Sequence, residues 1–352
     1  MKFTYKLQAL RGLQAGCSFY VCMIPLKYVK NFFINIDYDV PPECRAQRKL
    51  NESRIPEIKD YIINNRDSYV FSALAASIDG EIKFISSDFD KDLGILEIDM
   101  DSKILINDGQ HRKAAILAAI EEDETLLDET IPVVLFADKG LERSQQMFTD
   151  LNKHAVTTSK SLNALYDSKD RTSILTKKLV DKIDFLNRYT DKEKDNLGKF
   201  SSKLFTLNSL VNSNKRIVKC SVNDEDILNF MIEYWGNIIS NISEWQELIN
   251  GKLSKLSLRE DYIVTQGVCI LAFGYLGEYI FINHRNDYIK YLVNLKNIDW
   301  TRTNKKDWLN CAIKPNGRIN RSDRGIFLTY LKIKKLIGFK LYAEESNKLR
   351  KL

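Results

Sequence analysis

The sequence predicts an α+β protein, in which an N-terminal mixed α/β domain precedes a mainly helical C-terminal domain. Short β-branched and aromatic runs alternate with helix-forming runs through the first half, as expected for a sheet covered by helices. Amphipathic patterns with helical spacing dominate the second half. With 352 residues, of which 44% are apolar, the chain can form two cores. We therefore expect one domain over 1–170 and a second over 171–352.

The elements of the first domain follow from apolar runs bounded by turn residues. Strands are expected at 18–26, 69–78, 81–86, 104–107 and 131–138, and helices at 45–65, 113–123 and 142–155. The first helix should begin near Asn51 or Ser53, because Pro56 is tolerated only in a first turn. Asp79-Gly80 lies between two strand-like runs and is typical of a two-residue hairpin turn.

The second domain should be built from helices at 172–189, 224–245, 262–283 and 325–339, with a polar loop at 250–261. The run 262–283 carries no charge from Tyr262 to Gly277, but Gln266 and three glycines interrupt it. These interruptions favour a buried core helix over a membrane span. We therefore expect no membrane association.

Charge and cysteine usage limit the classes of function. The net charge of +6 permits binding to nucleic acid without requiring it. None of the six cysteines forms a C-x-x-C pair, which argues against a zinc site, and no other metal site is expected. The N-terminus lacks the apolar segment of a signal peptide. We expect a cytoplasmic protein with reduced thiols.

The stretch ILINDGQHRKAAILAAI, residues 104–120, places five chemically special residues between two apolar runs. Gly109 allows a tight turn and the close approach of a ligand, and the amides that follow, from Gln110 onward, form an anion site at a helix start. Arg112 offers a planar fork for phosphate, and His111 can move a proton near neutral pH. Asp108 can cap the helix, hold a neighbour or bind Mg²⁺. Together they predict a site for a phosphorylated ligand. The alternative, that Asp108 is only an N-cap and Arg112 only part of an ion pair, stays open.

This pentapeptide, placed after a strand and before an alanine-rich helix, resembles the signature of the DGQHR-domain proteins. Within them, the chain resembles the DNA sulfur modification protein B family, the regulator encoded with DNA phosphorothioation systems. The runs RAQRKLNESRIPEIKDYIINN, YVFSALAASIDGEIKF and QQMFTDLNKHAVTTSKSLNALYD come in that family's order. The resemblance covers roughly residues 15–175. It implies a transcription regulator that binds double-stranded DNA, with the other DNA sulfur modification proteins as additional partners. Whether the chain also forms a homo-oligomer stays open.

More distantly, the resemblance implies a ParB/sulfiredoxin-like domain, in which a turn ending in arginine binds nucleotide phosphates and a later polar residue supports metal or phosphate. By this analogy Arg112 is the phosphate arginine, and Asn152 is the later residue, with Lys153 beside it. The implied ligand is ATP or another nucleoside triphosphate with Mg²⁺. The residues expected to bind it are Gly109, Gln110, Arg112, Asn152 and Lys153.

Two basic segments are candidates for contact with the DNA backbone, because Lys and Arg side chains hold phosphates. One precedes the first long helix, and the other is the turn-rich run KPNGRINRSDRG at 314–325. An ordinary solvated basic surface is the alternative for both segments. The candidate residues are Arg45, Arg48, Arg54, Lys314, Arg318, Arg321 and Arg324.

Three hypotheses about function remain after the sequence analysis. The first is a DNA-binding transcriptional regulator with a nucleotide or phosphate site at the DGQHR motif. The second is a nucleotide hydrolase (ATPase) or a DNA-processing enzyme. There Asp108 would position Mg²⁺ or water, His111 would be the general acid/base, and Arg112 would stabilise the transferred phosphoryl group. The third is a scaffold whose motif is only structural.

Overall fold

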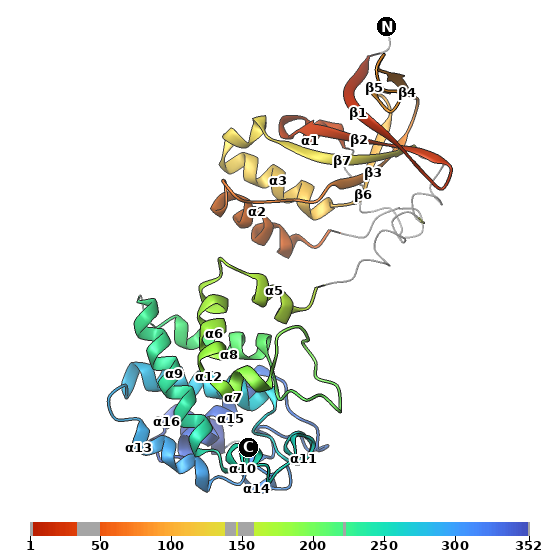
Figure 1. Ribbon diagram of the computed structural model, residues 1–352. Helices are drawn as coiled ribbons and strands as arrows, with labels where there is room; N and C mark the ends of the chain where they lie inside the picture. Colours follow the sequence, from red (N-terminus) through yellow and green to blue (C-terminus); the bar gives the residue numbers. More distant parts are fainter. Residues whose placement is uncertain (1–2, 34–49, 138–145, 147–157, 221–222, 351–352) are drawn as a thin grey trace. The chain divides into compact units, whose positions relative to one another are not determined.

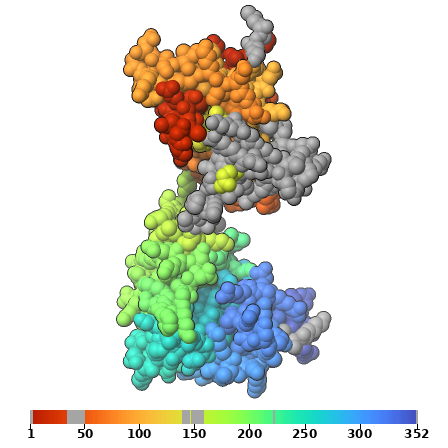
Figure 2. All heavy atoms as spheres, turned by 90° about the vertical axis from the view of Figure 1, so that its right-hand side faces the viewer, coloured from red at the N-terminus to blue at the C-terminus, as the bar shows by residue number. Residues whose placement is uncertain are grey.

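The computed structural model describes residues 3–33, 50–137, 146, 158–220 and 223–350. The chain divides into two compact units, residues 1–156 (unit 1) and 157–352 (unit 2). Figure 1 shows the ribbon, and Figure 2 shows the atoms of unit 1 in red to yellow and those of unit 2 in green to blue. Unit 1 contains a large mixed sheet and unit 2 mostly helices, so the expected α+β class is confirmed.

Unit 1 is organised around a seven-stranded sheet in the order β4-β5-β1-β2-β7-β3-β6. Strands β3 and β7 are parallel, and every other neighbouring pair is antiparallel. The strands β1 and β5 were not expected from the sequence. The strand bounds are Thr4–Gln14 (β1), Cys17–Pro25 (β2), Leu74–Asp79 (β3), Ile82–Ser86 (β4), Leu93–Asp99 (β5), Lys103–Asp108 (β6) and Thr130–Ala137 (β7).

The hairpin expected at Asp79-Gly80 is wrong. Strand β3 pairs with β6 and β7, whereas β4 pairs with β5, so residues 80–81 join β3 and β4 end to end. Residues 100–102 join β5 and β6 in the same way, and the Asp99 N–H donates to the Glu81 carbonyl across the junction at 3.3 Å. Because the chain links strands at opposite ends of the pairing order, the sheet must curl back on itself.

Helices cover the apolar face of this sheet: α1 (Val29–Phe32), α2 (Ile55–Asn64) and α3 (Gln110–Glu122). The expectation that the first long helix begins near Asn51 is confirmed, because the 3₁₀ turn η3 (Glu52–Arg54) leads into α2 and the Asn51 side chain caps it. The other 3₁₀ turns are η1 (Leu26–Tyr28) and η4 (Glu124–Asp128). In β7, alternate residues are buried, namely Ile131, Val133 and Leu135, because successive side chains of a strand point to opposite faces of the sheet.

Unit 2 packs its helices around one apolar core, to which α12 contributes most of its residues (Figure 1). The expected buried helix at 262–283 is confirmed as α12, although it begins only at Gly267. Gly274 lets α12 approach α8, since a Cβ there would lie 2.3 Å from the Ser213 carbonyl oxygen. The helices are α5 (Lys160–Tyr166), α6 (Arg171–Lys182), α7 (Asp184–Tyr189), α8 (Leu207–Val218), α9 (Asp224–Asn241), α10 (Ser243–Ile249), α11 (Lys255–Asp261), α12 (Gly267–Asn283), α13 (Ile289–Leu292), α14 (Lys305–Trp308), α15 (Asp323–Leu336) and α16 (Ala343–Arg350), with the 3₁₀ turn η5 (Val293–Asn297) and the short strands β8 (Thr190–Asp191) and β9 (Phe205–Thr206).

Three expectations for unit 2 need correction. The polar run 250–261 is not wholly a loop, because Ser254 caps α11 and Leu258 is buried. The expected helices 172–189 and 224–245 are each broken, at Ile183 and Ile242, where the backbone is extended. The expected helix at 142–155 lies outside the described residues, apart from Gln146. In the described part of the chain, none of the helices is long and apolar enough to cross a membrane.

Candidate functional site

The DGQHR motif forms the expected strand, turn and helix. Strand β6 ends at Asp108, Gly109 has a φ of +103°, and α3 begins at Gln110. Glycine is required at this turn for two reasons. The φ is left-handed, and a Cβ would lie 2.3 Å from Leu74 Cδ2. Just before the turn, Asn107 is the extra residue of a β-bulge, between the pairs Ala76↔Ile106 and Ala75↔Asp108. Bulges of this kind re-aim side chains at the end of a strand.

Arg112 ties the motif to the start of β3. Its Nη1 donates to the Ser72 carbonyl at 2.5 Å, to Ser72 Oγ at 2.6 Å and to the Ala73 carbonyl at 3.0 Å. Its Nη2 donates to Asp108 Oδ2 at 2.8 Å. Only 17% of the Arg112 side chain is exposed. The fork that could hold phosphate therefore already holds a protein segment that is forty residues away in sequence.

Asp108 serves as the partner of Arg112 and does not cap α3. The two residues form an ion pair with i,i+4 spacing, and the N-cap position is Gly109, which offers no side-chain hydrogen bond. The carboxylate of Asp108 is 49% exposed, so a ligand could still reach it. Among the described residues, no group of three His, Cys, Asp or Glu side chains could hold a metal ion.

His111 and Lys113 join the first turn of α3 to neighbouring chain segments. The Asn51 backbone N–H donates to His111 Nε2 at 3.0 Å, which requires an unprotonated Nε2 in this arrangement. Lys113 Nζ donates to the Phe33 carbonyl at 3.3 Å, and burial lowers the pKa of the Lys113 ammonium. The first turn of α3 is thus hydrogen-bonded to Phe33 and to Asn51, which lie just before and just after residues 34–49 in the sequence.

The start of α3 also keeps polar groups that could receive an anion. The helix has thirteen residues and no side-chain cap. Within the described residues, the backbone N–H groups of Gln110 and Arg112 have no acceptor, and neither does Arg112 Nε. Such groups, together with the partial positive charge of a helix N-terminus, favour phosphate or carboxylate. The turn therefore combines a structural clamp with an open set of donors.

The other candidate residues are distributed over both units. Asn152, Lys153, Arg45 and Arg48 lie outside the described residues, and Arg54 is exposed at the N-cap of α2. The run 314–324, which we name the basic loop, turns back on itself through Gly317, whose φ is +77°. Its last two residues, Asp323 and Arg324, already belong to the first turn of α15. The basic side chains of this loop are all exposed: Lys314, Arg318, Arg321 and Arg324.

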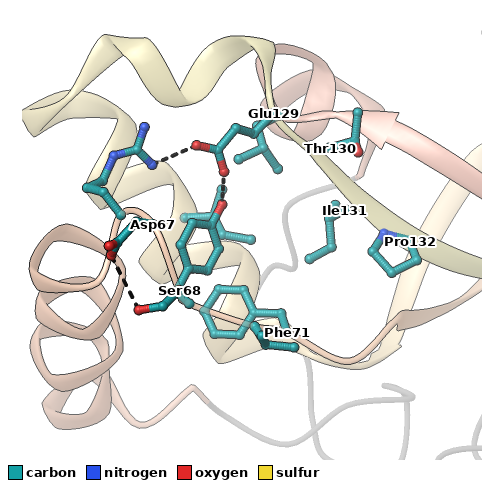
Figure 3. Close-up of a pocket in the computed structure, with 12 residues that line it drawn as sticks. Asp67, Ser68, Phe71, Glu129, Thr130, Ile131 and Pro132 are labelled. Atoms are coloured by element: carbon teal, nitrogen blue, oxygen red, sulfur yellow. Dashed lines mark hydrogen bonds and ion pairs between the residues drawn. The ribbon is translucent and has the colours of Figure 1, made fainter. Parts of the chain in front are cut away.

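A cavity of about 370 Å³ in unit 1 was not foreseen from the sequence (Figure 3). The Tyr69 hydroxyl donates to Glu129, and Arg66 Nη1 lies 2.8 Å from Glu129 Oε1. Burial, reinforced by the Glu129 carboxylate, raises the pKa of Tyr69 to about 12. Phe71 lines the cavity just before the Ser72 carbonyl that Arg112 holds. No local pattern could have revealed it, because its polar residues are some sixty positions apart in sequence.

Comparison with known proteins gives a family match. The family model DndB, described as DNA-sulfur modification-associated, matches residues 7–340. No curated protein and no solved structure matches the chain. The likeness to ParB/sulfiredoxin-like domains therefore stays a prediction. The family match covers the DGQHR turn and the basic loop, and it extends through the helical unit that offered no recognisable motif in the sequence. The chain belongs to the DNA-sulfur modification-associated family DndB.

Proposed function

We propose that this chain is a cytoplasmic, DNA-binding transcriptional regulator of a DNA sulfur modification system, in which the other modification proteins are its partners. Family membership supports the link to DNA sulfur modification. The observation that carries the DNA-binding part is the basic loop. Its four cationic side chains are exposed, and among the described residues none has a carboxylate within ion-pair distance.

Exposed cations without a carboxylate partner suit the DNA backbone for a physical reason. A cation already paired with a carboxylate must break that pair before it can contact a phosphate, whereas a free one only exchanges water and releases DNA counterions. The loop is also well ordered at its base. The Lys314 N–H donates to the Arg318 carbonyl at 2.8 Å, and the Asn320 N–H donates to the Ala312 carbonyl at 2.8 Å. An ordered base lowers the entropy lost when the loop binds.

The test is the salt dependence of binding to double-stranded DNA from the promoter region of the protein's own modification genes, compared with unrelated DNA. Arg318→Ala combined with Arg321→Ala should weaken binding and reduce the slope of log K against log salt by about 2, at roughly 0.9 per phosphate contact. Lys178→Ala combined with Lys182→Ala, which removes the same charge from exposed positions on α6, is the control. Equal slopes for the two double variants would remove the basic loop from the interface. Equal affinity for promoter and unrelated DNA would argue against a regulator.

The uncapped start of α3 supports a second part of the proposal, a phosphate or nucleotide site at the DGQHR turn. The free N–H groups of Gln110 and Arg112 would bind the phosphate, with Arg112 Nε beside them. Binding is favoured over hydrolysis, because the Asp108 carboxylate and His111 Nε2 both already have protein partners. A nucleotide hydrolase remains the alternative.

Gln110→Glu tests this site with little risk to the fold, because an acid in the first turn suits the helix dipole and repels phosphate. Calorimetric titration with ATP and Mg²⁺ should show at least a tenfold weaker affinity in this variant, whereas Gln110→Ala should bind nearly as the wild type does. Phosphate release from ATP, measured in parallel, separates the two activities. Turnover that Gln110→Glu abolishes would replace the binding proposal with the hydrolase.

A further inference from the structure

Unit 2 contains a cavity of about 630 Å³ that the sequence analysis did not single out. All of its lining belongs to unit 2, from the loop after β8, the starts of α8 and α12, the end of α11 and the residues around 302 and 319–326. Cavities of this size accommodate cofactors and other small ligands. Because three of its lining residues are arginines, we name it the arginine cavity: Arg259, Arg302 and Arg321.

In the described structure, these arginines form no ion pair, although the Asp261 and Glu260 carboxylates act on Arg302 from a greater distance. Among the described residues, none of the three lies within ion-pair distance of an acid. Asp195, the one acid in the lining, is held elsewhere, because its carboxylate accepts from the Lys160 N–H, the Ser161 N–H and Ser161 Oγ at 2.8–2.9 Å. Cations that are partly removed from water normally gain counter-ions or neutralise. The cavity therefore has an excess of positive charge.

Two of the arginines are fixed in place by backbone carbonyls. Arg259 donates to the carbonyls of Leu197, Gly198 and Lys199, at 2.8–3.2 Å. Arg302 Nη2 donates to the Arg259 carbonyl at 2.8 Å, and burial lowers the pKa of the Arg302 guanidinium. Carbonyl partners orient a guanidinium without cancelling its charge. Within the described residues, Arg302 Nη1 and the whole fork of Arg321 are unoccupied.

The start of α12 opens into the same space. Its N-cap residue, Gln266, turns its side chain away to the Arg259 carbonyl at 2.9 Å, so α12 has no side-chain cap. In the described structure, the N–H groups of Gly267 and Val268 have no acceptor. A Cβ built on Gly267 would meet nothing within 4 Å, so this helix end faces open space next to the arginines.

The rest of the lining suits the body of a nucleotide. Asn208 and Asn212 offer amide groups, and Asn212 Nδ2 donates to Asn208 Oδ1 at 3.0 Å. Apolar side chains such as Phe205 and Leu271 line the cavity as well. A phosphorylated ligand with a planar, hydrogen-bonding body would use all three kinds of surface. We propose that the arginine cavity binds a mononucleotide-sized ligand, with its phosphate at the start of α12 between Arg302 and Arg321. This site is separate from the DGQHR turn. It shares Arg321 with the basic loop, so a nucleotide and the DNA backbone would compete for that guanidinium.

Gly267→Asp is a sharp test of the arginine cavity. The new carboxylate would occupy open space at the phosphate position, and an acid in a first turn does not harm a helix. Gly267→Asn is the matched control, because it has the same shape without the charge. All four tryptophans belong to unit 2, so tryptophan fluorescence during thermal unfolding reports ligand binding to this unit. The probes are AMP, ATP, adenosine and inorganic phosphate, each without DNA.

We expect AMP or ATP to raise the unfolding temperature of the wild type and of Gly267→Asn, and the affinity to fall at least tenfold in Gly267→Asp. Adenosine should have little effect, and inorganic phosphate should bind more weakly than the nucleotides.

Equal nucleotide affinity in the Asp and Asn variants would overturn the site. Equal affinity for inorganic phosphate and for the nucleotides would overturn the proposal that the ligand is a nucleotide. If Gln110→Glu loses nucleotide binding and Gly267→Asp keeps it, the nucleotide site lies in unit 1 and not in the arginine cavity. No nucleotide binding, with DNA binding reduced by Gly267→Asp, would make the cavity a contact for the DNA backbone.

Discussion

Arg112→Ala should destabilise unit 1 specifically, because the guanidinium holds the start of β3 against the DGQHR turn. The variant loses charge-assisted hydrogen bonds to the carbonyls of Ser72 and Ala73, which are worth about 1.5–3 kcal/mol each when buried. Ser72 is exposed, so water replaces part of that loss. The half-exposed pair with Asp108 adds at most about 1 kcal/mol. We expect a loss of about 2–3 kcal/mol in the free energy of unfolding of unit 1.

The placement of the tryptophans allows the two units to be measured separately. All four lie in unit 2, whereas far-ultraviolet circular dichroism reports both units. In urea, the dichroism transition of unit 1 should shift to lower denaturant by about 1–1.5 M, given a slope near 2 kcal/mol per molar. The tryptophan transition should not move. Arg54→Ala, the same truncation at an exposed arginine of unit 1, should change stability by less than about 0.5 kcal/mol. An Arg112→Ala midpoint equal to that of Arg54→Ala would refute the clamp.

Three further predictions follow from the same contacts. Gly109→Ala places a Cβ at a φ of +103° and against Leu74. The free energy of unfolding of unit 1 should fall by about 1–3 kcal/mol, as read from the dichroism midpoint. An unchanged midpoint would contradict the turn geometry. Glu345→Ala leaves the fully buried Lys334 ammonium without its carboxylate partner. The free energy of unfolding of unit 2 should fall by about 3 kcal/mol, more than in Lys334→Met, as read from the shift of the tryptophan midpoint. A larger loss in Lys334→Met would contradict this reasoning. Because Tyr69 has its pKa raised from 10.0 to about 12, the folded chain holds that proton more tightly. Its contribution is complete below pH 10 and is lost between pH 10 and 12. The difference in the free energy of unfolding between the wild type and Tyr69→Phe should therefore become smaller from pH 10 to pH 12. A constant difference would show that Tyr69 does not titrate with this raised pKa.

The sequence by itself was enough to predict features that depend on neighbouring residues. The α+β class followed from alternation and helical spacing, and the strand, turn and helix at DGQHR followed from Gly109 and its flanking runs. The buried helix α12 could be predicted because it carries no charge from Gly267 to Gly277. In each case the deciding interaction is local, either a backbone conformation or a hydrophobic period, and it acts within a few residues of the chain.

Only the tertiary structure decided which distant groups meet. Asp79-Gly80 has hairpin chemistry, yet the pairing of β3 with β6 and β7 overrode it, because sheet register depends on the whole apolar face. Arg112 was expected to hold phosphate, and its clamp on Ser72 depends on how β3 packs beside the turn. Arg302 and Arg259 are far from one another in sequence, so the sequence alone did not indicate that their charges meet in one cavity. Counter-ions and cavity walls come from residues that are remote in the chain, so local patterns cannot specify them.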